Sequence, residues 1–150
     1  MTTYIPLWTT KLVKEDQLPI PDGASGYVSS PRDGYTLLRP YAEGEIQENL
    51  WVILLNTKRR VIGIERVYRG TLDTTPVRVA EIMRPAILAG ASAIIVAHNH
   101  PSGDTTPSGS DVAMTKRVID AGDLLGISVL DHLVISDENS TSMREVGLGF

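Results

Sequence analysis

The chain has 150 residues, 42% of them apolar, which is typical of one domain with a hydrophobic core. It contains no cysteine, so disulfide bonds, a thiolate nucleophile and cysteine-ligated zinc are excluded. A transition metal would have to be bound by the three histidines together with Asp or Glu side chains. The net charge of −4 and the lack of a dense Lys/Arg stripe disfavour nucleic acid as a partner.

No membrane partner is expected from the hydropathy pattern. No apolar stretch reaches the roughly 18 residues that a membrane span requires. Charged residues between positions 11 and 16 interrupt the short apolar stretches at the N-terminus, so a signal peptide is not expected either. We therefore expect a cytoplasmic protein, in which the basic clusters Lys58–Arg60 and Lys116–Arg117 are exposed surface.

Residues 1–29 are predicted to form an extended arm ahead of a domain that covers residues 30–150. Residues 20–26 are rich in turn formers and show neither helical nor strand periodicity. Such an arm can wrap its own domain or a neighbouring chain, so a homo-oligomer formed through the arm is one expectation. Ser30 followed by Pro31 is typical of a helix start, and this helix is predicted to run to Ala42.

Two strands and a helix are expected next. Leu50–Leu55 is a continuous apolar run, typical of a strand buried on both faces. A turn at residues 56–60 leads into Val61–Tyr68, which is predicted as the hairpin partner of that strand. Thr75-Pro76 predicts the start of a helix that ends near Gly90.

The C-terminal half is expected to alternate between strands and helices. The predicted elements are a buried strand over Ala93–Ala97 that leads directly to His98, a loop to Pro107, a helix over Ser108–Leu125 closed by Gly126, a strand over Ile127–Ile135 and a short helical turn over Ser142–Gly147. The order α-β-β-α-β-α-β predicts an α/β (α+β) fold in which helices pack on a mixed β-sheet.

His98, His100 and Asp111 are the candidate metal ligands. The two histidines are two residues apart after a buried strand, so extended backbone directs both side chains the same way. Two histidines and a carboxylate leave a coordination position open, as catalytic zinc requires. Each residue also has a structural explanation, since Asp111 completes an S-x-x-D capping box with Ser108. The concentration of two of the three histidines in one loop favours a metal site.

The segment AHNHPSGD-x-x-PS-x-x-D, which spans residues 97–111, resembles the JAMM motif of JAB1/MPN-type metalloproteases. It matches the version found in RadC-like JAB-domain proteins of bacteria. The resemblance extends over about residues 30–150 and includes Arg69–Leu72, Asp131–Ile135 and Ser142–Leu148. It implies the JAB1/MPN fold, a mixed sheet flanked by helices that is similar to the cytidine deaminase arrangement.

The resemblance also implies roles for individual residues. The family binds Zn²⁺ through two His and one Asp, here His98, His100 and Asp111, and a Ser, here Ser108, helps to stabilise the oxyanion. A Glu activates the zinc-bound water. Among the candidates Glu43, Glu45, Glu48 and Glu65, we expect it to be Glu48, which stands just before the apolar run that begins at Leu50.

The implied activity is zinc-dependent hydrolysis of an amide bond in a peptide or protein substrate, as by a metallopeptidase or isopeptidase. Two alternatives stay open: a non-catalytic metal-binding scaffold, and a DNA-repair or mobile-element-associated factor, since the RadC name carries a DNA-repair label. Fuller RadC-like members carry a helix-hairpin-helix segment, for which residues 1–29 are too short. The letters H-N-H do not indicate an HNH nuclease, because that motif spreads its residues over a longer ββα unit. His132 is expected to be structural or to support a ligand.

Overall fold

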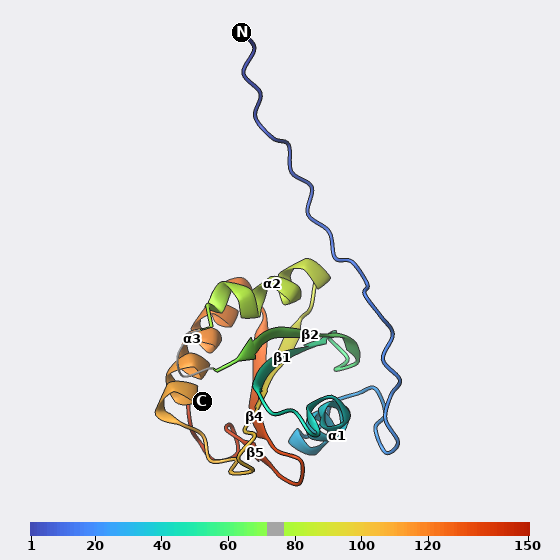
Figure 1. Cartoon of the computed structure of the whole chain (residues 1–150), viewed down its shortest axis with the longest axis vertical. Coiled ribbons are helices and arrows are strands. Elements are labelled where there is room, and N and C mark those ends of the chain that lie inside the picture. Colours follow the sequence, from blue (N-terminus) through green and yellow to red (C-terminus); the bar gives the residue numbers. More distant parts are fainter. Residues whose placement is uncertain (72–76) are drawn as a thin grey trace.

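The computed structural model describes residues 1–71 and 77–150. Within these residues, three helices and five strands follow one another as α1 (Pro31–Ala42), β1 (Glu48–Leu55), β2 (Val61–Gly70), α2 (Val79–Ala89), β3 (Ala93–Asn99), α3 (Gly109–Leu125), β4 (Ser128–Ile135) and β5 (Ser140–Ser142). The strands form one sheet in the order β2-β1-β3-β4-β5 (Figure 1). All neighbours are antiparallel except β3 and β4, which are parallel. The expected mixed sheet with packed helices is therefore confirmed.

The pairing of β3 with its two neighbours decides which side chains meet at the end of this strand. Leu50 of β1 pairs with His98, and Val96 pairs with His132 of β4. Since alternate residues of a strand share a face, His98 and His132 lie on the same side of the sheet. The crossover helix α3 connects the two parallel strands and packs on that same side.

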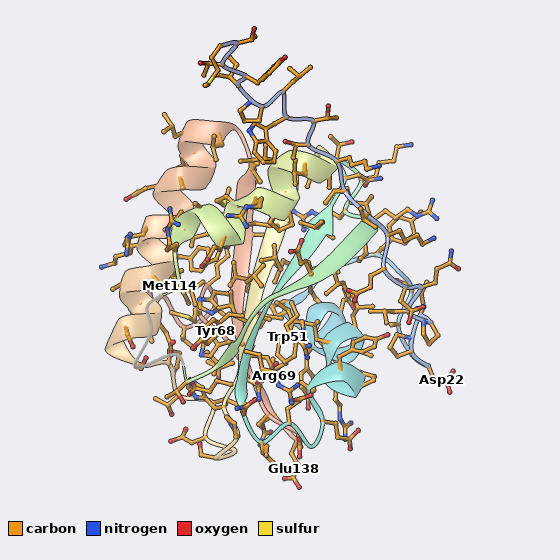
Figure 2. The ribbon with its side chains drawn as sticks, turned by 45° about the horizontal axis from the view of Figure 1, so that its top comes forward. Asp22, Trp51, Tyr68, Arg69, Met114 and Glu138 are labelled. Carbon is orange, nitrogen blue, oxygen red and sulfur yellow. The ribbon has the colours of Figure 1, made fainter. Side chains whose placement is uncertain are left out.

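The two faces of the sheet bury separate apolar clusters. One face packs against α1 and includes Trp51, while the other packs against α2 and α3, where Met114 contributes from α3 (Figure 2). All seven residues of β3 are buried, as expected for a central strand covered by helices on both sides. This double cover gives the side chains at the end of β3 a fixed and largely dry environment.

Helix α1 begins where the sequence predicts. Ser30 is its N-cap, and Ser30 and Asp33 form a reciprocal capping box. Before this helix, Tyr27 forms an isolated bridge with Arg60, and Val28 is buried. The first residues of the chain extend away from the domain without regular secondary structure (Figure 1). No helix among the described residues has the length and apolar character needed to cross a membrane.

One predicted helix start lies outside the described residues, and one strand of the structure is absent from the sequence-based prediction. The helix start expected at Thr75-Pro76 lies outside the described residues, and α2 begins at Val79 after the N-cap Arg78. Strand β5 was not expected because Ser140–Ser142 carries no apolar pattern. The short helical turn expected over Ser142–Gly147 is present after Ser142, the last residue of β5: Val146 N donates to the Ser142 carbonyl over 3.2 Å, and turns continue to Gly147.

Candidate metal centre

His98, His100 and Asp111 converge on one point at the carboxyl end of β3. One ligand atom from each lies within 4.8 Å of the others. The Nε2 atoms of His98 and His100 are 2.9 Å apart, and the Asp111 oxygens lie 3.3 Å and 3.6 Å from them. His98 and Asp111 are buried, while His100 is half-buried. This is the expected three-residue cluster, with one member partly open to solvent.

Local structure brings the three residues together. His98 is inside β3, and the backbone turns directly after His100, where Gly103 donates to the His100 carbonyl with a positive φ of 87°. Asp111 lies in the first turn of α3, and Ser108 is the N-cap of that helix. The predicted capping box is present, since Ser108 N donates to Asp111 Oδ2 over 2.7 Å and Asp111 N donates to Ser108 Oγ over 3.1 Å. This cap holds the Asp111 carboxylate at the site.

The electrostatics of the cluster favour a cation between its members. The Asp104 carbonyl lies 2.7 Å from His100 Nδ1, so this nitrogen donates a hydrogen bond to it. When the His100 ring is neutral, its Nε2 atom therefore has no hydrogen and directs a lone pair at the cluster. The nearby Asp111 carboxylate raises the pKa of His100. Burial raises the pKa of Asp111, but contacts with His100 and His98 outweigh burial and hold this pKa far below its usual range. An anionic carboxylate and imidazole lone pairs that converge within 4.8 Å fit a divalent metal ion.

A second layer of side chains supports His98 from inside the core. His132 Nε2 is 2.7 Å from His98 Nδ1, and His132 Nδ1 is 2.6 Å from Thr115 Oγ1. Burial lowers the pKa of His132 well below its ordinary value. The sequence leaves two interpretations of His132 open, a structural residue or a support for a ligand. Its contact with His98 favours the second. Thr115 was missed, although its spacing of four residues from Asp111 places both on one face of α3.

Glu48 lies on the same face of the sheet as His98. It is the first residue of β1, and it shares a sheet face with Leu50, whose pairing partner is His98. The charge of Glu48 contributes to the raised pKa of His100, which is consistent with this position. Of the other glutamates considered, Glu45 forms an ion pair with Arg69 over 3.2 Å, and Glu65 lies within β2 away from the strand end.

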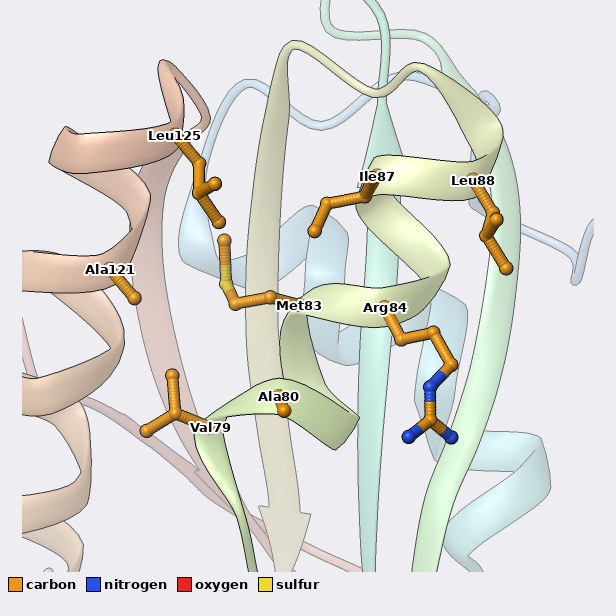
Figure 3. A pocket seen from close by; sticks show the side chains of 8 residues that line it. All are labelled: Val79, Ala80, Met83, Arg84, Ile87, Leu88, Ala121 and Leu125. Atoms are coloured by element: carbon orange, nitrogen blue, oxygen red, sulfur yellow. The ribbon is translucent and has the colours of Figure 1, made fainter. Parts of the chain in front are cut away.

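Two hollows differ in their relation to the cluster. A polar hollow of about 250 Å³ reaches His100 and offers access to it; it is lined by Ala42, Glu45, Asn99, His100, Pro101, Ser102, Gly103, Ser136, Asp137, Glu138 and Asn139. An apolar groove of about 410 Å³ lies between α2 and α3 (Figure 3); it is lined by Val79, Ala80, Met83, Arg84, Ile87, Leu88, Ala121 and Leu125. The groove contains no residue of the cluster.

The fold and this cluster define a class: a mixed-sheet α+β domain with a His-His-Asp cluster at a strand end that could hold a metal ion. The chain belongs to the RadC-like JAB domain family, whose model matches residues 28–148. The family expected from the sequence is therefore confirmed.

Similar proteins cover the same part of the chain. The chain is 50% identical to a UPF0758 protein of Roseiflexus sp. (strain RS-1) over 123 residues, which are 82% of this chain and 53% of that protein. It is 47% identical to a UPF0758 protein of Chloroflexus aurantiacus over 82% of this chain and 54% of that protein. It is 45% identical to a UPF0758 protein of Clostridium kluyveri over 85% of this chain and 56% of that protein. The chain thus spans about half the length of these curated relatives.

Proposed function

We propose that this domain is a zinc-dependent hydrolase that cleaves an amide bond in a peptide or protein. The observation that carries the proposal is the convergence of His98, His100 and Asp111, whose ligand atoms lie within 4.8 Å of one another, with His100 also lining a polar hollow. Three protein ligands leave a coordination position for water or substrate, as in catalytic rather than structural zinc sites. The JAMM-like spacing of these residues and membership in the RadC-like JAB family support the same conclusion.

The proposed division of labour follows from the positions of the side chains. His98, His100 and Asp111 would hold Zn²⁺, which lowers the pKa of a coordinated water and polarises a carbonyl. Glu48, on the sheet face of His98, acts as the general base that accepts the proton of the attacking water and then as the acid that protonates the leaving amine. After these two proton transfers Glu48 is a carboxylate again, and one water molecule has been added across the amide bond.

Ser108 is proposed to stabilise the oxyanion. Its hydroxyl oxygen accepts the Asp111 N–H at the start of α3, and its side chain is exposed beside the cluster. A hydroxyl both accepts and donates, and the exposed Ser110 hydroxyl is 3.0 Å from Ser108 Oγ, so Ser108 can turn its hydrogen from Ser110 to a developing negative charge. The N-terminus of α3 lies at the same place and favours negative charge electrostatically.

Metal content tests the first half of the proposal. We expect about one zinc ion per chain in the purified protein, and loss of it in His98→Ala and Asp111→Ala. Asp120→Ala, which removes an exposed carboxylate from the same helix, is the matched control and should keep the metal. A wild-type protein that does not bind zinc when the metal is supplied would contradict the proposal.

Hydrolysis tests the second half. The zinc-loaded protein is incubated with a complex peptide mixture, and new termini are identified by mass spectrometry. Wild-type protein should produce them, and Glu48→Gln should lose this activity while it keeps its zinc. Stoichiometric zinc without cleavage would indicate a non-catalytic scaffold, and salt-sensitive binding to duplex DNA would favour the DNA-associated alternative.

A further inference from the structure

A buried line of hydrogen bonds runs from the backbone of α3 to the candidate metal centre. Thr115 Oγ1 donates to the Asp111 carbonyl over 2.7 Å and lies 2.6 Å from His132 Nδ1. His132 Nε2 in turn lies 2.7 Å from His98 Nδ1. Thr115, His132 and His98 are each at most 2% exposed, so water does not compete along this line.

The position of one hydroxyl hydrogen sets the direction of the whole line. Thr115 has one hydroxyl hydrogen, and it is used in the bond to the Asp111 carbonyl, which can only accept. In the reverse orientation two oxygens would face each other at 2.7 Å with no hydrogen between them. The Thr115 oxygen must therefore accept from His132, so His132 carries its ring hydrogen on Nδ1.

The same count continues to His98. A neutral imidazole has one N–H, so a His132 that donates from Nδ1 presents a lone pair at Nε2. His98 Nδ1 must then donate to this nitrogen, which leaves His98 Nε2 without a hydrogen. That is the atom 2.9 Å from His100 Nε2 and 3.3 Å from Asp111 Oδ1. In the metal-free protein it accepts a hydrogen that His100 carries on Nε2, and in the metal-bound protein the same lone pair binds the metal.

We propose that Thr115 is a positioning residue for metal binding: through His132, its hydroxyl fixes His98 in the tautomer whose Nε2 lone pair faces His100 and Asp111. The inference rests on metal binding by this cluster, which is part of the proposed function, and is independent of hydrolysis. Hydrogen-bonded partners behind a histidine ligand fix its tautomer and orientation, and their loss typically lowers metal affinity about 10–100-fold. Thr115 has this effect from a distance, without contact with the metal.

The tautomers are measured directly in metal-free protein with ¹⁵N-labelled histidine, by long-range ¹H–¹⁵N correlation spectra. We expect the ring hydrogen on Nδ1 in both His98 and His132. Thr115→Val keeps the shape of the side chain but removes the hydroxyl, so the fixed tautomers should be lost. Thr115→Ser should restore them, because the hydroxyl is back. A His98 with its hydrogen on Nε2 in metal-free wild-type protein would overturn the proposal.

Zinc affinity, measured by competition with a chelating dye, gives the second readout. Thr115→Val should bind zinc about 10–100-fold more weakly than wild type, and Thr115→Ser should bind like wild type. The matched control is Thr141→Val, which also removes a partly buried hydroxyl, but one that bonds Thr105 over 2.8 Å and no histidine. Equal affinity of Thr115→Val and wild type would overturn the proposal.

Failure of this proposal is distinguishable from failure of the proposed function. If wild-type protein binds no zinc, both proposals fail; if wild type and Thr115→Val bind zinc equally well, only the proposal for Thr115 fails. If zinc binds but no peptide is cleaved, the hydrolase fails while both readouts for Thr115 still apply.

Discussion

The Ser108 N–H donates to Asp111 Oδ2 over 2.7 Å while the Asp111 N–H donates back to Ser108 Oγ over 3.1 Å. Asp111 Oδ1 lies 3.3 Å from His98 Nε2. One carboxylate thus caps α3 and completes the candidate metal centre. Capping and metal binding by Asp111 are therefore compatible. The helix cap requires only an oxygen that accepts a hydrogen bond, whereas a carboxylate metal ligand also requires the negative charge.

Asp111→Asn separates these two roles. The amide oxygen can still accept from Ser108 N, so α3 should keep its N-cap, and the free energy of unfolding of the metal-free protein should fall only by what the carboxylate charge gains from His98 and His100. Zinc affinity should fall by more than the 10–100-fold typical of a lost supporting hydrogen bond, because a charged ligand is removed. Urea unfolding and zinc titration measure the two effects. Undiminished zinc binding would mean that Asp111 is only a cap.

Ser108 is tested with two substitutions that remove the same hydroxyl at different cost to the cap. Ser108→Ala should lower the free energy of unfolding by about 1 kcal/mol, and Ser108→Gly by only a few tenths. If the hydroxyl stabilises the oxyanion, both variants should lose kcat equally, by about 100-fold or more. Ser128→Ala is the control and should leave kcat unchanged, because Ser128 is exposed and pairs with Ala93 at the opposite end of β3 from the cluster. A kcat that follows stability would assign Ser108 to the cap alone.

Asp33 predicts a pH-dependent contribution to stability. Its Oδ2 accepts from Ser29 N and Ser30 N, each over 2.8 Å, and these bonds, that from Ser29 above all, lower the pKa of Asp33 below 3.8. Since the pKa is lower in the folded state, the stabilisation is present above pH 3.8 and is lost as the pH falls through the folded-state pKa.

Asp33→Asn should therefore lower the free energy of unfolding at neutral pH by about 0.5–1 kcal/mol and make no difference well below the folded-state pKa. Urea unfolding at a series of pH values measures the difference between the two proteins. Asp22→Asn is the control, because Asp22 is exposed and lies outside the helix cap. A constant difference across the pH range would show that the carboxylate charge of Asp33 contributes nothing.

Much of the fold could be predicted because local signals and tertiary packing agree. The buried runs at Leu50–Leu55 and Ala93–Ala97 became β1 and β3, each extended by two residues where polar side chains continue the ladder. Ser30 and Ser108 mark helix starts, and Gly126 closes α3 in the left-handed region with a φ of 71°. In contrast, β5 consists of polar residues that are strand-like only because they pair with Leu133–Ile135 of β4.

The candidate site divides in the same way. His98, His100 and Asp111 are close in sequence, so spacing alone indicates that they converge. The link from His98 to His132 depends on the parallel register of β3 and β4, in which Val96 faces His132, and a register of this kind is not encoded in either segment by itself. Thr115 joins them only because α3 packs across both strands, which is a tertiary result.

Two glycines of α3 provide the last prediction. A Cβ at Gly122 would overlap the carbonyl oxygen of Ile127 and lie 2.9 Å from Val129 Cγ2, where the end of α3 packs on the start of β4. Gly122→Ala should therefore lower the free energy of unfolding by about 1–3 kcal/mol, since backbone must move. Gly109→Ala is the matched control: a Cβ there meets nothing within 4 Å, and its φ is not positive. Gly109→Ala should stabilise the protein by about 0.4–1 kcal/mol. Thermal and urea unfolding measure both variants, and a Gly122→Ala protein as stable as wild type would show that α3 and β4 can separate at this contact without cost.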